Sequence, residues 1–150
     1  MKRIKTIENL KKYIQHIERA ELWLKRSYDM CQNTGIKSEY SPEEYDAFET
    51  LTSRFARVCD ILIHKVYRAI DAVEMESGGT MIDVVNRAHK RELFEDVDEI
   101  RKIKDLRNEV AHEYIEEELL ALFYDIFQFT PKLLEYCENA KKYCKKKQLY

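Results

Sequence analysis

Residues 107–114, RNEVAHEY, place an arginine, an asparagine, a histidine and a tyrosine within eight positions. The imidazole of His112 can exchange a proton near neutral pH, and the guanidinium of Arg107 offers planar donors that match phosphate oxygens. This pair suits phosphodiester cleavage without metal, in which a base removes the ribose 2′-OH proton and a cation stabilises the charge on phosphorus. RNA fits as substrate, since DNA has no 2′-OH. Spacing alone equally fits a hydrogen-bonded surface histidine near a helix end.

The motif belongs to a predicted polar stripe on one side of its helix. At about 100° per residue, the stripe consists of Arg101, Asp105, Asn108 and His112. It predicts an i,i+4 ion pair from Arg101 to Asp105 and a hydrogen bond from Asn108 to His112. Arg107 lies about 140° from His112 on a straight helix. Either the helix ends before His112 and turns it back, or a symmetric partner supplies a second motif to a shared cleft.

The elements that must position this motif are predicted to be helices. The chain has 150 residues, of which 45% are hydrophobic and 36% charged, with three glycines and two prolines. This length fits one domain over residues 1–150, and few turn residues with many charges favour long solvated helices. We predict an all-α fold, an antiparallel four-helix-type bundle with an additional short helix.

Apolar periodicity predicts a first helix over about residues 6–33. Ser41, Pro42 and Glu44 form a capping box with proline at the first helical position, so a second helix begins there. It runs to Gly78 and Gly79, and its length of about 50 Å exceeds what one layer of short helices covers. Either the bundle is tall, or part of the apolar stripe of this helix meets another subunit.

Three further helices follow in the prediction. Thr80 with Asp83 opens a short one over residues 81–93, and Asp96 with Glu99 opens the helix that carries the motif. The apolar seam of that helix consists of Ile100, Ile103, Leu106 and Val110. The last segment, residues 116–150, is apolar in its first half, bent or broken at Thr130–Pro131, and basic over about residues 136–150.

Other features limit the function classes. The net charge of −2 gives no global positive field, so any polyanion site must be a local patch. The first residues lack a signal-peptide core and a span of about 20 apolar residues, which predicts a cytoplasmic protein without membrane contact. No metal site or cofactor is predicted, because the cysteines have core spacing and fit reduced, structural thiols. They are Cys31, Cys59, Cys137 and Cys144.

A second set of cations lies in the second helix. Its members are Arg54, Arg57, Lys65 and Arg68, with His64 between them. One interpretation is a solvated face. The other is a basic wall of the catalytic cleft, since Arg54, Arg57 and His64 recur at helical spacing and could approach the helix that carries the motif.

The stretch LRNEVAHEY resembles the signature of the HEPN superfamily, an arginine followed after four to six residues by a histidine. His112-Glu113-Tyr114 is also similar to HepT-like toxins, in which one residue and a tyrosine follow the histidine. The order of elements agrees with this resemblance, since the motif ends the penultimate long helix and an apolar helix follows.

The resemblance implies a metal-independent endoribonuclease toxin that works as a homodimer with paired motifs in a cleft. Arg107 and His112 would be catalytic, and Asn108 would support them. Asp105 and Arg101, from the same polar stripe, are predicted as further supporting residues. The resemblance also implies a nucleotidyltransferase antitoxin that adenylylates Tyr114. A non-catalytic HEPN module that partners a nucleotidyltransferase is the alternative.

Overall fold

The first helix of the computed structural model is α1 (Lys2–Thr34), one turn longer at its start than predicted. The structure describes residues 2–112 and 115–150, with Glu116 described by its backbone only. One face of α1 is buried along its length, from Leu10 through Ile17 and Leu24 to Cys31, and the other face is solvated. The periodicity in the sequence therefore predicted this helix and its buried face correctly.

A second long helical rod begins with the predicted capping box. The Glu44 N–H donates to Ser41 Oγ at 3.2 Å, and the Ser41 N–H donates to Glu44 Oε1 at 2.9 Å. The rod consists of α2 (Pro42–Asp60), the π-helix η1 (Ile61–Tyr67) and α3 (Arg68–Val73). It ends at Val73, before the two glycines. The π-helical segment was not predicted from the sequence.

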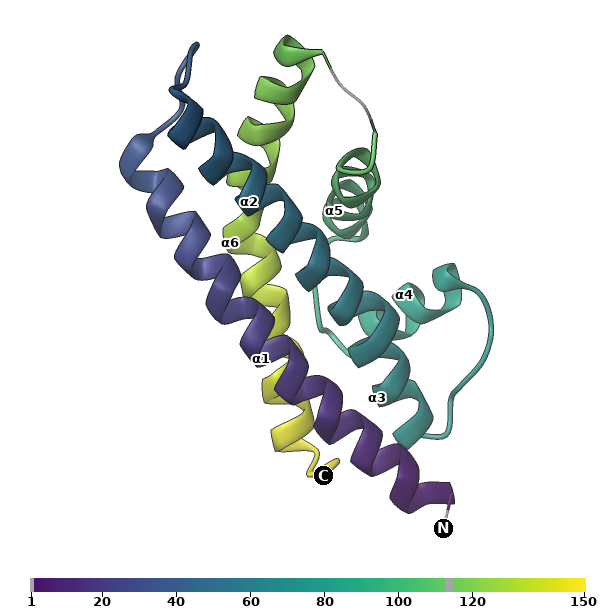
Figure 1. Ribbon diagram of the computed structural model, residues 1–150. Coiled ribbons are helices and arrows are strands. Elements are labelled where there is room, and N and C mark those ends of the chain that lie inside the picture. The colour runs from purple at the N-terminus through teal and green to yellow at the C-terminus, as the bar shows by residue number, and fades with distance from the viewer. Residues whose placement is uncertain (1, 113–114) are drawn as a thin grey trace.

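The apolar stripe of this rod is covered by the chain's own helices. Figure 1 shows α1 antiparallel to α2, with the last helix, α6 (Glu116–Lys146), running beside both. Every residue of the stripe is at most 5% exposed: Phe48, Leu51, Phe55, Cys59, Leu62, Val66, Ile70 and Val73. The bundle is therefore tall, and the stripe needs no second subunit to cover it.

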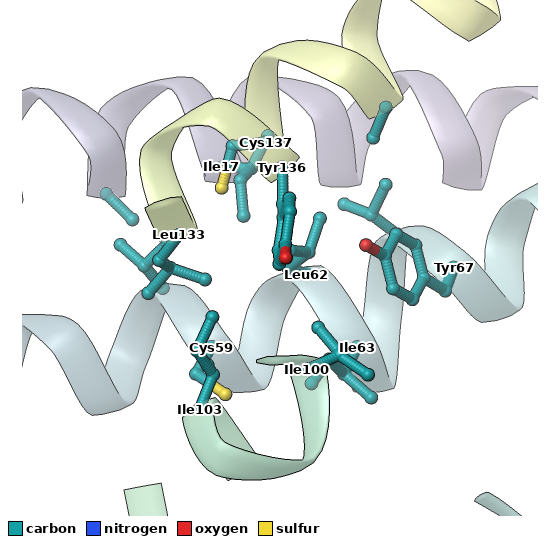
Figure 2. Close-up of a cluster of buried hydrophobic side chains, with 14 of the residues drawn as sticks. Ile17, Cys59, Leu62, Ile63, Tyr67, Ile100, Ile103, Leu133, Tyr136 and Cys137 are labelled. Atoms are coloured by element: carbon teal, nitrogen blue, oxygen red, sulfur yellow. The ribbon is translucent and has the colours of Figure 1, made fainter. Parts of the chain in front are cut away.

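The centre of the core joins four helical segments. Figure 2 shows Ile17 of α1, Leu62 of η1, Ile103 of α5 and Tyr136 of α6 pointing into one cluster. Burial of such side chains contributes about 25 cal/mol per Å² of apolar surface removed from water, and it is the main force that fixes α5 against α2 and α6. The four cysteines are buried and free, as predicted.

The short helix α4 (Met81–Lys90) also begins with its predicted capping box, Thr80 with Asp83. An ion-pair network fixes it to α3. Asp71, only 2% exposed, accepts from Arg87 Nε at 3.0 Å and from Arg91 Nη1 at 2.5 Å. Arg91 Nε also donates to Glu74 at 2.6 Å. These bonds hold α4 and Arg91, which precede α5, against α3.

The helix α5 (Val97–Glu109) carries the motif and has Asp96 as its N-cap. Asp96 Oδ1 accepts from the Asp98 N–H at 2.8 Å. The predicted capping box with Glu99 is wrong, because the Glu99 carboxylate instead accepts a hydrogen bond from the Tyr136 hydroxyl. Helix α5 is thereby tied to α6 through a side chain 37 residues away.

Helix α6 passes through Pro131 without interruption, so of the two predicted alternatives at Thr130–Pro131, a bend or a break, the break does not occur. Thr130 Oγ1 donates to the Ile126 carbonyl at 2.7 Å within the helix. The basic end predicted over about residues 136–150 is mostly α6, and it buries Tyr136, Cys137 and Cys144. Only one face of this end is therefore a basic surface.

All elements in the described part of the chain are helical, which confirms the all-α prediction. None of these helices has a stretch long and apolar enough to span a bilayer.

Candidate functional site

The C-terminal end of α5 places Arg107 against Asp60, the last residue of α2. Arg107 Nε donates to Asp60 Oδ1 at 2.6 Å, and Arg107 Nη2 donates to Asp60 Oδ2 at 2.8 Å. These hydrogen bonds, which the Asp60 carboxylate accepts, raise the pKa of Arg107 above its ordinary value. This is the two-pronged geometry with which an arginine binds a carboxylate or a phosphate.

Packing explains why these two residues meet. Ile103 and Leu106 of α5 are fully buried, as is Leu62 of η1, while Cys59 is 2% exposed. Arg107 follows Leu106 directly and so leaves the core at the rim. Both partners remain accessible, with side-chain exposures of 31% for Arg107 and 39% for Asp60.

Sequence reasoning missed Asp60. It lies 47 residues from Arg107, so no local spacing connects the two. Its one signal is that it interrupts the apolar run from Val58 to Ile63, where an unpaired carboxylate would be unfavourable.

A cavity of about 540 Å³ lies beside this ion pair, between the end of α5 and η1. Its lining comprises Asp60, Ile61, His64, Lys65, Arg107, Asn108 and Ala111. The structure therefore places Arg107 and Asn108 at one cavity together with His64 and Lys65. The π-helical segment starts directly after Asp60 and carries both of these residues, and π-helical turns occur often at functional sites.

The environment of His64 favours the neutral imidazole. Burial lowers the pKa of His64, and Arg68, Lys104 and Arg107 act in the same direction, while the Asp60 carboxylate opposes them. A neutral imidazole can accept a proton at physiological pH. His64 therefore has the chemistry of an acid–base group and lines the same cavity as Arg107.

His112 lies beyond the end of α5. The helix ends at Glu109, and the His112 N–H donates to the Glu109 carbonyl at 3.0 Å in the turn that follows. His112 is exposed and is not part of the cavity lining. One predicted alternative was that the helix ends before His112 and turns this residue back toward Arg107. The helix does end before His112, but within one chain the imidazole does not join Arg107 in this cavity.

The polar stripe is correspondingly shorter than predicted, since His112 is not on the helix. Arg101 and Asp105 are exposed, and no ion pair joins them within residues 2–112. Tyr114, the predicted modification site, and Glu113 lie outside the described residues.

The predicted basic wall separates into two parts. Arg54 points toward α1, where Nη1 donates to Ser27 Oγ at 2.6 Å and the guanidinium lies 5.1 Å from the centre of the Trp23 ring. Arg54 therefore does not approach the motif helix, and the interpretation of these cations as a basic wall does not hold for this residue. His64 and Lys65 do line the cavity beside α5.

Across residues 2–112 and 115–150, side chains of His, Cys, Asp and Glu form no group of three or more that could hold a metal ion. Comparison of the chain with protein-family models, with curated proteins and with solved structures gave no match.

Proposed function

We propose that this chain is a metal-independent endoribonuclease of the HEPN type. The observation that carries the proposal is the cavity in which Arg107 and Asn108 meet His64 and Lys65, at the accessible end of α5. It offers a two-pronged cation for a phosphate, an amide that can hydrogen-bond to the sugar or phosphate, and an imidazole suited to proton transfer.

In the proposed reaction a histidine takes the proton from a ribose 2′-OH, and the 2′-oxygen attacks the adjacent phosphorus. The bond from phosphorus to the 5′-oxygen breaks, and that oxygen takes up a proton from an acid. The products are a 2′,3′-cyclic phosphate and a 5′-hydroxyl. Arg107 stabilises the charge that develops on the phosphate oxygens, and Asn108 orients the phosphate. His112 is the proposed acid–base group of the motif.

The proposal includes a homodimer, because within one chain His112 lies outside the cavity that Arg107 lines. A symmetric partner would bring a second His112 to the cavity. Ile115, directly after the motif region, is 61% exposed and would be an apolar contact residue in a dimer that pairs through the motif. We expect Ile115→Asp to convert a dimer paired through the motif into a monomer in sedimentation experiments. Leu22→Asp, at a residue 66% exposed on α1, is the control and should leave the dimer intact.

In the full proposal the chain is the toxin of a toxin–antitoxin pair. A nucleotidyltransferase antitoxin would neutralise it by adenylylating Tyr114. Intact-mass measurement after coexpression with a nucleotidyltransferase tests this step, because each added adenylyl group raises the mass by a fixed increment. A mass that does not change, or an increment that persists in Tyr114→Phe, would contradict the proposed modification.

The catalytic proposal is tested with purified protein, RNA and a chelator. We expect His112→Ala and Arg107→Ala to abolish RNA cleavage and growth inhibition, while His16→Ala, which removes an exposed imidazole of α1, keeps both. Each variant should retain its helical circular dichroism spectrum. Full toxicity and cleavage by His112→Ala would refute the assignment.

A second candidate is a non-catalytic HEPN module that docks a nucleotidyltransferase. The ion pair with Asp60 favours it, because both Arg107 nitrogens in that pair already donate to a carboxylate. This candidate predicts a stable complex that His112→Ala leaves unchanged, and RNA that stays intact at high protein concentration.

A further inference from the structure

The cavity beside Arg107 is the first of three that adjoin one another. A second cavity, of about 240 Å³, shares His64 and Lys65 with it and continues between η1 and α1. A third, of about 410 Å³, shares Thr6 and Ala72 with the second and reaches the first turn of α1. Figure 1 shows this part of α1 beside α3, at the end of the bundle where the chain begins. We call the three cavities together the α1–η1 track.

The charge of the α1–η1 track differs from that of the whole chain. The chain has 28 acidic and 26 basic side chains. The track is lined by five cationic side chains: Lys2, Arg3, Lys65, Arg68 and Arg107. Among the residues described, its one acidic lining residue is Asp60, which is paired with Arg107. The track is therefore the local positive patch that a polyanion requires on a chain of negative net charge.

The remaining lining residues fit an unpaired nucleic-acid strand. Tyr13 and His64 line the second cavity and supply the aromatic rings that base stacking requires. Lys12 Nζ and Lys65 Nζ lie 4.8 Å and 5.8 Å from the centre of the Tyr13 ring, so cations accompany this ring. Asn9 and Thr6 offer hydrogen-bonding groups for ribose hydroxyls and base edges. Stacking combined with backbone cations is the usual basis for binding single strands.

We propose that the α1–η1 track binds single-stranded RNA and leads it from the first turn of α1, across η1, to Arg107 and Asn108. The inference rests on the proposed ribonuclease function and names its substrate as an unpaired strand. RNA is favoured over an anionic membrane, because the track is continuous with the cavity at Arg107 and Asn108 and contains stacking rings.

The test measures RNA binding separately from cleavage. A fluorescent single-stranded RNA oligonucleotide is titrated with the His112→Ala protein, which leaves the RNA intact, and anisotropy is recorded at several salt concentrations. Lys65→Glu combined with Arg68→Glu reverses two charges in the centre of the track. The matched control is Lys25→Glu with Arg26→Glu, an equal charge change at exposed positions of α1 outside the three cavities.

We expect the track variant to bind RNA at least about tenfold more weakly than the control variant. The slope of log affinity against log salt should fall by about 0.7 for each phosphate that the variant no longer neutralises. Lys2→Glu with Arg3→Glu tests the other end of the track at exposed positions where the fold is not at risk, and it should weaken RNA binding as well. Circular dichroism checks that each variant is folded.

The outcomes separate the two proposals. Equal losses of RNA affinity in the track and control variants would overturn the track and leave the ribonuclease proposal standing. RNA cleavage by the wild type without measurable RNA binding by His112→Ala would also overturn the track. Binding to vesicles of anionic lipid that depends on Lys65 and Arg68, with no RNA binding, would replace RNA by a membrane surface. Neither RNA binding nor cleavage would overturn both proposals.

Discussion

Asp60→Asn tests whether the carboxylate that holds Arg107 competes with an RNA phosphate. The substitution keeps the size of the side chain and removes its charge, so the guanidinium becomes more available to an incoming phosphate. Asp60 is also the one acidic side chain among the described residues that line the α1–η1 track. We therefore expect Asp60→Asn to tighten RNA binding and to destabilise the fold slightly.

The geometry of the pair sets the size of both effects. The distances of 2.6 and 2.8 Å are short and the pairing is two-pronged, but the side chains are 31% and 39% exposed, so solvent screens the attraction. Exposed ion pairs contribute about 0.2–1 kcal/mol, and the two-pronged geometry places this one near the upper end. A change of about 1 kcal/mol corresponds to about fivefold in RNA affinity. The free energy of unfolding should fall by no more than about the same amount.

The assay uses the His112→Ala background, with anisotropy for RNA affinity and urea denaturation for stability. Asp46→Asn is the matched control, since Asp46 is an exposed residue of α2 for which no ion pair occurs in the described structure. In an Arg107→Ala background the effect of Asp60→Asn should shrink, and the difference measures the coupling between the two residues. Weaker RNA binding by Asp60→Asn than by the control would refute the reasoning, because Asp60 would then position Arg107 for the phosphate rather than compete for it.

Three further predictions concern the fold and the site. Asp71→Asn should lower the free energy of unfolding in urea by about 3 kcal/mol, because it breaks the ion pairs of the buried Asp71 carboxylate with Arg87 and Arg91, while Arg91 keeps its partner Glu74. A decrease below about 1 kcal/mol would show that these pairs contribute little. The four buried cysteines should not react with a thiol reagent at pH 8 until urea unfolds the chain, since burial raises their pKa; fast labelling of the native protein would contradict this. The pKa of His64, already lowered by burial, should fall further in Asp60→Asn by NMR titration. An unchanged pKa in the variant would show that Asp60 does not act on His64, and a higher one would contradict the expected direction. Because a lowered histidine pKa means that the unfolded state binds protons more readily, His64 should make the protein less stable as pH falls through 6.5.

The fold could be predicted where local chemistry determines it. The capping boxes at Ser41 and Thr80 each satisfy backbone N–H groups within four residues, so the starts of α2 and α4 followed from the sequence. The same logic failed at Asp96, because Glu99 has a competing partner in Tyr136 of α6. A distant hydrogen bond can override a local pattern, and no spacing rule reveals it.

Prediction of the candidate site had the same limit. Arg107 and Asn108 were identified from their motif, and the structure places both at one cavity. Asp60 and His64 join that cavity only because α2 packs against α5 and η1 continues directly from α2, which is a tertiary event. The π-helical segment also has no signature in the composition of Ile61–Tyr67, yet it carries three of the lining residues, Ile61, His64 and Lys65.

The position of the ion pair sets a condition for the proposed ribonuclease activity. If Arg107 is to hold a phosphate with both prongs, its bonds to Asp60 must be given up or shared, and the strength of that pair then opposes substrate binding. Salt weakens the pair, but it weakens RNA binding more, because binding depends on several phosphates being neutralised at once. The cations of the α1–η1 track offset this opposition by attracting the strand before it reaches Arg107. A short strand that does not extend past His64 lacks the cations of the rest of the track. It should therefore bind weakly at Arg107, because the ion pair between Asp60 and Arg107 would stay intact and oppose binding of the phosphate.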